Sequence, residues 1–282
     1  MVEKKRVYIV VKTYPTISDK YAELVCTAGV LEDGSWIRLY PIPYRKLEIK
    51  QKYPKYTWIQ VEVERNTKDF RPETYRPINL TKIIVEPRPK KIDWNLRRKI
   101  IFNNKEIYTN LQKMIAQAKA KTNPISLAIF KPTKVLNFKA EPTSREWDLK
   151  KLNNLNALSQ QLNLFQTPEE TEDEFKIVPK VPYKFSYTFE DDSNKQSTLM
   201  IEDWEIGMLY FNCLKKHHNE SIAVTKVKEK YFDEFIKKDL YFFMGTTKKF
   251  HNVAPNPFII IGVFYPPLKP PFEQMTLFDA YK

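Results

Sequence analysis

The sequence predicts an α+β protein in which two small β-barrels follow one another, joined by helices and followed by a flexible Pro-rich tail. Short runs with strand patterns fill the first ninety residues and return after residue 123. Between them, apolar residues recur at the three- and four-residue spacing of helices. The expected organisation is a basic barrel domain (1–90), a helical connector (91–122), a second barrel domain with inserted helices (123–265) and the tail (266–282).

The first barrel is predicted from short strands at 7–11, 23–30, 36–40, 58–64 and 83–85. The turn signal Glu32-Asp33-Gly34 joins the second and third of these strands into a hairpin. Residues 58–64 alternate apolar and polar side chains, which is typical of a strand with one face in water. Short strands with a hairpin and without a Gly-rich repeat favour a small barrel.

A second set of strands is predicted after the connector, at 126–130, 135–138, 183–189, 197–201, 240–245 and 257–264. Helices are expected within 93–121, from Trp204 onward, and at about 226–238. Asp203 directly precedes the second of these helices, and its side chain is suited to capping the first turn.

Two neighbouring strands carry a recognisable pattern. Val25-Cys26-Thr27-Ala28-Gly29 reads C-x-A-G, and Gly34-Ser35-Trp36-Ile37-Arg38 reads G-x-W-I-R. This pair resembles the start of bacterial dual OB-fold domain proteins. The resemblance implies that the two barrels are OB-like, and many members of that family look linked to mobile elements and genome defence. It implies no catalytic residue.

The net charge of +13 lies entirely in the first half of the chain. Residues 1–150 carry 31 Lys and Arg against 16 Asp and Glu, whereas residues 151–282 carry 16 against 18. A half-molecule with a charge of +15 attracts polyanions, and nucleic acid is the most common of these in the cytoplasm. The alternative is a solvated basic face without a partner.

Composition excludes several other classes. The chain has five glycines and neither a G-x-G-x-x-G motif nor a Walker A loop, so we expect no nucleotide cofactor. No stretch approaches the roughly 20 apolar residues that span a bilayer, and the N-terminus has no signal-peptide pattern. Cys26 and Cys213 are too few for a disulfide framework. The expected location is the cytoplasm, with no membrane partner.

Aromatic and cationic residues alternate through the basic half, as they do in proteins that bind single strands, where rings stack on bases and cations follow phosphates. Single-stranded DNA is therefore the favoured partner. On the strand at 36–40, the two-residue period predicts that Trp36, Arg38 and Tyr40 share one face. The alternatives are that the rings belong to the core and that the arginines form local ion pairs. The candidate nucleic-acid-binding residues are Trp36, Arg38, Tyr40, Tyr44, Arg45, Lys46, Arg71, Tyr75 and Arg76.

The C-terminal tail carries a second candidate site. Gln274, Leu277 and Phe278 form Q-x-x-L-F, which looks like the peptide that bacterial replication and repair proteins insert into the sliding clamp. One polar anchor sets the register and two apolar side chains fill a pocket. The Pro-rich stretch 265–271 is expected to act as a stiff spacer. The alternative is a hook that folds back onto the domain.

A similar motif at 161–165 follows leucines at helical spacing, so a buried helix stripe is the stronger interpretation there.

The sequence identifies no catalytic residues and no metal ligands. A metal-dependent nuclease using Asp203 or Glu205 with Lys226 or Lys228 stays open as an alternative, as does a modified-base reader. A third possibility is a protein-interaction subunit of a defence complex, because the second half is near neutral and rich in Phe and Tyr.

Overall fold

The structure is a computed structural model that describes residues 1–17, 24–154 and 178–268. The candidate clamp peptide at 274–278 and the similar motif at 161–165 lie outside these residues. The chain is mixed α+β, as predicted, with a closed five-stranded β-barrel followed by two further sheets and several helices. No helix in the described ranges is long and apolar enough to cross a membrane.

The barrel is formed by the first half of the chain. Its strands are β1 (Val2–Lys12), β2 (Val25–Val30), β3 (Trp36–Ile42), β4 (Trp58–Arg65) and β5 (Thr74–Pro77). They are hydrogen-bonded in the order β1-β2-β3-β5-β4, and β4 pairs with β1 to close the barrel. The pairs are antiparallel except for β3 with β5, which run parallel.

Short 3-10 helices connect parts of this barrel. Two of them lie between β3 and β4, at Tyr44–Lys46 and Ile49–Gln51. A third, Leu80–Lys82, precedes β6 (Ile84–Val85), which is added to the far edge of β4. The predicted strand at 83–85 therefore forms, but the barrel is closed without it, by the pairing of β1 with β4. The barrel strand that the sequence did not predict is β5, which is too short and too polar to show an alternating pattern.

The barrel interior follows from the two-residue period of its strands. Alternate side chains point inward and form one buried apolar cluster, which includes Val7, Ile9, Ile37, Leu39, Ile59, Val61 and Val63. The β2–β3 hairpin turns at Gly34, whose φ of +87° favours glycine. A Cβ at Gly34 would lie 2.3 Å from the carbonyl oxygen of Asn103, so this turn also packs directly on the end of the next helix.

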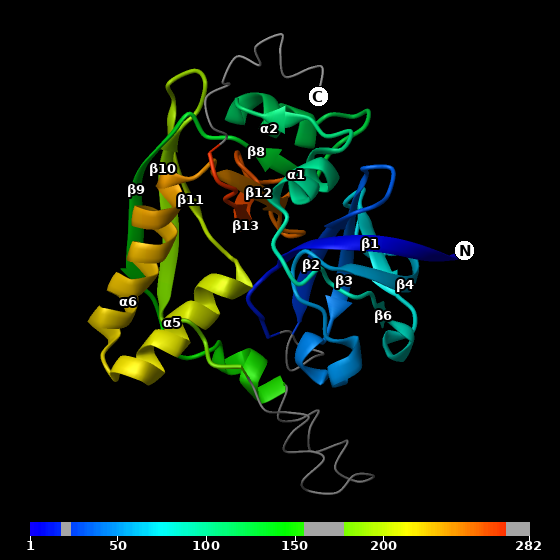
Figure 1. Cartoon of the computed structure of the whole chain (residues 1–282), viewed down its shortest axis with the longest axis horizontal. Coiled ribbons are helices and arrows are strands. Elements are labelled where there is room, and N and C mark those ends of the chain that lie inside the picture. Colours follow the sequence, from blue (N-terminus) through cyan, green and yellow to red (C-terminus); the bar gives the residue numbers. More distant parts are fainter. Residues whose placement is uncertain (18–23, 155–177, 269–282) are drawn as a thin grey trace, which may run out of the picture.

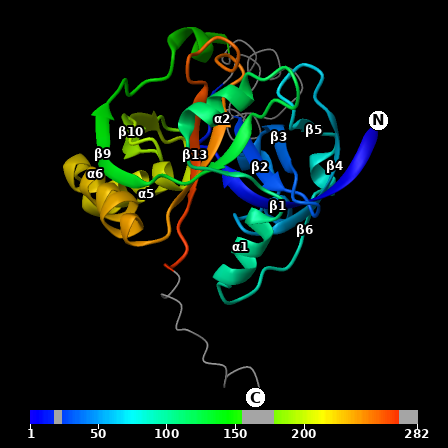
Figure 2. The same cartoon turned by 90° about the horizontal axis from the view of Figure 1, so that it is seen from above.

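The connector contains α1 (Trp94–Phe102), β7 (Ile107–Tyr108) and α2 (Leu111–Ala118). Each helix begins after a residue that caps it. The Asp93 carboxylate accepts from the amide of Leu96 at 2.8 Å, and Asn110 accepts from the amide of Lys113 at 3.0 Å. Figure 2 shows α1 beside β1 and β6, at the edge of the barrel.

The second half contains β8 (Leu127–Phe130), β9 (Lys134–Pro142), β10 (Tyr183–Glu190), β11 (Gln196–Met200), β12 (Tyr241–Thr246) and β13 (Phe258–Phe264). One sheet has the order β11-β10-β9 and the other β13-β12-β8-β7. A parallel bridge between Ile201 and Ile260 joins them.

Helices α5 (Trp204–His217) and α6 (Glu220–Lys228) connect β11 to β12, followed by a π-helical turn (Glu229–Glu234) and a 3-10 turn (Phe235–Lys237). The predicted cap is confirmed, because Asp203 accepts from the amide of Glu205.

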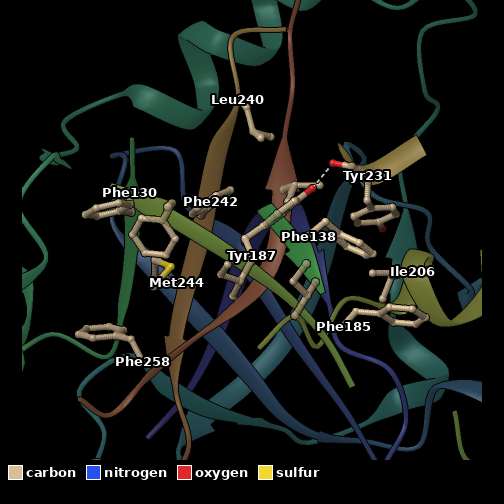
Figure 3. Close-up of a cluster of buried hydrophobic side chains, with 14 of the residues drawn as sticks. Phe130, Phe138, Phe185, Tyr187, Ile206, Tyr231, Leu240, Phe242, Met244 and Phe258 are labelled. Carbon is tan, nitrogen blue, oxygen red and sulfur yellow. Dashed lines mark hydrogen bonds between the residues drawn. The ribbon is translucent and has the colours of Figure 1, made fainter. Parts of the chain in front are cut away.

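The core of the second half is dense in aromatic side chains from both sheets and from the helices (Figure 3). The Tyr187 and Phe242 rings stack with centroids 5.2 Å apart and an interplanar angle of 9°. The Tyr187 hydroxyl is buried and donates to the backbone carbonyl of Tyr231, which satisfies the one polar group of that ring. The Phe and Tyr alternation along β10 therefore builds a core.

A third apolar cluster joins the two halves. It combines Tyr8, Val10, Ala28 and Val30 from the outer face of β1 and β2 with side chains from the second half, namely Leu127, Ile129, Phe243, Ile261 and Phe264. Figure 1 shows the first barrel on one side, β9 to β11 with α6 on the other, and β12 and β13 between them. The outer face of β1 and β2 is thus buried by the second half of the chain.

Phe264→Ala tests whether this junction stabilises the whole chain. Phe264 is fully buried and its ring lies within 6.2 Å of the rings of Tyr56, Trp94 and Phe102. We expect the free energy of unfolding to fall by about 3–5 kcal/mol, because truncating a buried Phe leaves a cavity. Urea denaturation measures it. Phe250→Ala, at a ring that is 48% exposed, is the matched control, and equal effects of the two would contradict a shared core.

Candidate nucleic-acid interface

Trp36 and Arg38 share a face of β3, as predicted, and that face lies against the second half of the chain. The Trp36 ring packs edge-on against Phe243, with centroids 6.2 Å apart. Arg38 is 1% exposed and donates to the Ser126 hydroxyl at 2.6 Å, the Ser126 carbonyl at 3.0 Å and the Thr74 hydroxyl at 3.2 Å. This position gives Arg38 a structural role at the junction.

Arg71 is also buried at the junction. Its guanidinium makes a two-pronged ion pair with Asp69, with N–O distances of 2.9 and 2.6 Å, and it donates to the carbonyl of Thr246. The neighbouring Glu73 accepts from the amide and hydroxyl of Ser126. The β4–β5 loop therefore binds the second half through both charged side chains.

Tyr44 belongs to a buried polar cluster below the barrel. Its hydroxyl donates to the carbonyl of Tyr53 at 2.5 Å, and its ring packs edge-on against Trp204 at 5.3 Å. The Lys12 ammonium lies 3.3 Å from the Tyr44 hydroxyl and 3.2 Å from the Tyr53 carbonyl, and no carboxylate of the described residues is bound to it. Burial lowers the pKa of Lys12 to about 8.

Lys55 lies beside this cluster and holds the two halves together electrostatically. Its ammonium is 3.1 Å from both carboxylate oxygens of Asp203 and 2.7 Å from Glu205. Both Lys55 and Asp203 are buried. Burial opposes the charge on each, and their mutual attraction keeps the pair ionised, so the pKa of Lys55 is raised.

Arg76, Tyr75, Tyr40 and Arg45 are more exposed than Arg38 and Arg71. Arg76 is exposed and forms an ion pair with Glu64 on β4, and Tyr75 is partly buried beneath the guanidinium of Arg65. Tyr40 and Arg45 are partly buried, and Lys46 ends the first 3-10 helix. The structure therefore does not gather the predicted residues into one exposed surface.

A groove of about 350 Å³ lies on the other side of the barrel, between α1 and the outer face of β1 and β4. Trp58 contributes an aromatic ring to it, and the Arg6 guanidinium lies 4.4 Å from the centre of that ring. Arg6 also pairs with Glu86 and Glu32. The other lining residues are Leu31, Glu32, Leu96, Lys99, Ile100 and Asn103.

The segment that connects the two walls of the groove is strongly basic. Residues 88–99 contain six Lys and Arg and one acidic residue, Asp93. The segment starts beside the groove, because the amide of Glu86 donates to the carbonyl of Trp58 at 2.9 Å. It ends in α1, whose Lys99 lines the groove. Arg88, Lys90, Lys91 and Lys99 are exposed and form no ion pair with another described residue.

Two arginines of α1 fix the helix in place. Arg97 lies over two rings, with its guanidinium carbon 4.1 Å from the centre of Tyr56 and 5.0 Å from that of Trp94. Arg98 donates to Asp239 at 2.6 Å and to the carbonyl of Pro267 at 2.8 Å. One arginine therefore packs on the barrel, and the other joins the helix to the second half.

Sequence reasoning missed this groove although part of its signal was visible. The run Arg88-Pro89-Lys90-Lys91 is the start of the basic segment, and Trp58 lies on a strand that was correctly predicted. The sequence does not predict that α1 packs beside β1 and β4 and so forms the second wall of the groove.

Three of the four residues considered for a metal-dependent nuclease form ion pairs. Asp203 and Glu205 bind Lys55, and Lys226 pairs with Glu229. Asp191, in the acidic run 190–192, accepts hydrogen bonds from Ser193, Lys195 and Leu111. Within the described ranges, no group of three or more His, Cys, Asp or Glu side chains is placed to hold a metal ion.

Comparison with known protein families divides the chain after α1. A family model described as Domain of unknown function (DUF8758) matches residues 3–103, and one described as Domain of unknown function (DUF8757) matches residues 108–282. The chain belongs to the DUF8757 family. The boundary between the two matches falls within the predicted connector, and the DUF8757 match includes the tail.

No curated protein matches the sequence. Among solved structures, one described as "Structure of murine DNA binding protein bound with ds DNA" is similar over 96% of this chain and 100% of its own, with 7% identity and a TM-score of 0.31. A TM-score at this level does not establish a common fold. All residues that line the groove lie within residues 3–103, the part of the chain that matches DUF8758.

The buried Lys12 predicts a pH dependence of stability. The unfolded chain holds this proton up to the ordinary pKa of 10.5, whereas the folded chain releases it at about 8. Between these values the unfolded state binds more protons, so the free energy of unfolding rises with pH. Lys12→Met should lower that slope by up to about 1.4 kcal/mol per pH unit.

Urea denaturation from pH 7 to 9.5 measures this slope below the range in which exposed tyrosines ionise. Lys105, whose pKa burial also lowers to about 8, contributes a slope of the same sign that persists in the variant. Lys113→Met, at an exposed lysine, is the control. A slope unchanged by Lys12→Met would contradict the prediction.

Proposed function

We propose that this protein binds nucleic acid, with single-stranded DNA as the favoured ligand, along the groove between α1 and β1–β4. The observation that carries the proposal is the combination of Trp58, covered by Arg6, with the cation-rich segment 88–99, whose Lys99 lines the same groove. Rings that stack on bases and cations that follow the backbone are what sequence-tolerant single-strand binding requires. The concentration of positive charge in residues 1–150 supports the same ligand.

We further infer that both barrels are OB-like. The strand order β1-β2-β3-β5-β4, with only β3 and β5 parallel, supports this for the first barrel. In the second half, β8 and β9 together correspond to the first strand of the first barrel. That strand, β1, pairs with β2 and β4, and in the same way β9 pairs with β10 and β8 pairs with β12. The parallel bridge between Ile201 and Ile260 then corresponds to the pairing of third and fifth strands.

This assignment explains why the groove, rather than β3, is the better site. OB-folds commonly bind oligonucleotides on the face of their second and third strands. In the first barrel that face is covered by the second half, because Ala28, Val30 and Arg38 are buried there. The groove lies on β1 and β4 instead and stays open to solvent, with Lys99 exposed at its edge.

Neutralising the free cations tests the proposal. The triple variant Lys90→Gln, Lys91→Gln, Lys99→Gln should weaken binding to a single-stranded oligonucleotide by at least tenfold at low salt. The slope of log affinity against log salt should become shallower by about 0.7 for each lysine that contacts a phosphate. Fluorescence anisotropy across a salt series with single-stranded DNA, duplex DNA and RNA measures both quantities.

A matched triple variant, Lys215→Gln, Lys216→Gln, Lys237→Gln, removes the same charge from exposed positions in the second half. It should leave affinity and slope close to those of the unmodified protein. If both triple variants weaken binding equally, the effect is one of net charge and the groove is not the site.

We also propose that Gln274, Leu277 and Phe278 recruit the protein to a bacterial sliding clamp. The support is the Q-x-x-L-F pattern at the end of a Pro-rich stretch. The start of that stretch is held by the body of the protein: Tyr265 stacks on Phe235 with centroids 3.8 Å apart, and the carbonyl of Pro266 accepts from the amide of Asp239. A fixed starting point followed by a short spacer suits a peptide presented to a partner.

The double variant Leu277→Ala, Phe278→Ala should abolish binding to an immobilised bacterial sliding clamp, because the two side chains supply the apolar anchor. Surface plasmon resonance measures it. The same variant should keep its affinity for DNA, which separates this proposal from the groove. Leu164→Ala, Phe165→Ala changes the similar internal motif and is the control. Clamp binding retained in the first variant and lost in the second would overturn the assignment.

A further inference from the structure

A second hollow lies at the meeting point of the two halves, away from the groove. It is a pocket of about 260 Å³. One wall is the β1–β2 loop of the first barrel, at Tyr14, Pro15 and Thr16. The others are the start of β10, the end of β11, the first turns of α5 and the segments around Trp147 and Lys180. Pockets at domain boundaries and barrel mouths are the usual position of small-molecule sites.

Aromatic side chains line this pocket from several elements. Tyr14 is held in place from both sides: its hydroxyl donates to the carbonyl of Pro179 at 2.8 Å, and its ring lies against α5. That close approach requires Gly207, because a Cβ there would lie 2.2 Å from the Tyr14 ring. Trp147 is fixed by its indole N–H, which donates to the carbonyl of Val178 at 2.8 Å. Tyr183 and Phe185 complete the aromatic lining.

Glu202 is the one acidic side chain of this lining that no cation neutralises within the described residues. The adjacent Asp203 binds Lys55, whereas the Glu202 carboxyl has no hydrogen bond or ion pair in the same part of the chain. Only its backbone amide is engaged, by the carbonyl of Ile260 at 2.8 Å. Burial raises the pKa of Glu202, since apolar surroundings solvate its charge poorly. A ligand that donates two hydrogen bonds to the Glu202 carboxylate would compensate for the poor solvation of its charge.

Lys180 supplies a cation to the same pocket. Its ammonium contacts the Ser144 hydroxyl and the Glu146 carbonyl, which are neutral acceptors, and lies 5.9 Å from the centre of the Trp147 ring. Lys184, by contrast, is paired with Glu141 at 3.0 Å. Lys180 is therefore the lysine of the lining that keeps its charge available for a ligand anion.

We propose that this pocket binds a guanine nucleotide, with the base among the aromatic rings, its N1–H and N2–H₂ groups donating to Glu202, and its phosphate near Lys180. An ionised carboxylate offers acceptors only, so it pairs with an edge that presents two adjacent donors. Guanine has such an edge, whereas adenine and cytosine present one donor beside one acceptor. This site is separate from the groove, and the proposal does not rest on nucleic-acid binding there.

The guanine has two possible sources, a free nucleotide or a base of a single strand, and the test distinguishes them. Isothermal titration measures GMP, AMP, CMP and UMP. Anisotropy compares a thymidine dodecamer with the same oligomer carrying one central dG. We expect GMP to bind at least fivefold more tightly than AMP or CMP, or the dG oligomer to bind at least fivefold more tightly than the all-thymidine one.

Glu202→Gln removes the paired acceptors and keeps the shape of the side chain. It should abolish the preference for guanine, because an amide presents one donor and one acceptor. Lys180→Gln should weaken GMP at least threefold and leave guanosine unchanged. Glu229→Gln, at an exposed glutamate that pairs with Lys226, is the matched control, and thermal denaturation verifies that each variant folds.

A preference for GMP that Glu202→Gln abolishes assigns the free nucleotide, and a preference shown only within the oligomer assigns the single strand. Equal affinity for all four nucleotides and both oligomers would overturn the proposal. So would a guanine preference that persists in folded Glu202→Gln. Loss of groove binding in the triple lysine variant has no bearing on either result, so the two proposals fail independently.

Discussion

The structure depends on burying the apolar outer face of the first barrel's β1 and β2. A barrel normally needs apolar side chains only inside, yet Tyr8, Val10, Ala28 and Val30 point outward and are also buried. They lie against β8, β12 and β13, so the second half covers what would otherwise be an exposed apolar patch. Folding of one half is therefore coupled to the presence of the other.

Polar side chains embedded in this junction determine how the halves align. Arg38 and Glu73 both bind Ser126, and Lys55 binds Asp203. A buried charge without its partner is costly, so only an alignment that completes these pairs is stable. The apolar cluster provides the buried area of the junction, and the ionic contacts fix how the two halves are aligned. The same alignment positions Tyr14 against α5 and so forms the pocket beside Glu202.

Much of the fold was predictable because strand periodicity is a local property. The hairpin at Gly34, the alternation along β4 and the cap at Asp203 are all visible in a few consecutive residues. Strand β5 was not predictable, because four residues that end in Pro77 carry no periodic signal. Arg38 also looked like a surface residue, since Ser126, its partner, lies 88 residues away in the sequence.

The candidate sites were harder to predict for the same reason, because they depend on contacts between residues far apart in the sequence. Charge asymmetry indicated nucleic acid, but composition assigns charge to a half of the chain and not to a face. Two of the predicted arginines, Arg38 and Arg71, bind the second half, while Lys99 is exposed in the groove that Trp58 also lines. An arginine in a sequence is a phosphate ligand or a structural ion-pair partner, and only the fold distinguishes the two roles.

The two proposed contacts of the protein with a replication site meet at α1. Arg98 of this helix binds the carbonyl of Pro267, the point from which the tail continues toward the clamp-type peptide, and Lys99 lines the groove. Gln274 follows Pro267 by seven positions, a span of at most about 25 Å. A clamp that holds the peptide would therefore hold the groove close to the DNA that the clamp encircles. The resulting effective concentration allows a weak groove to act where a free protein would dissociate.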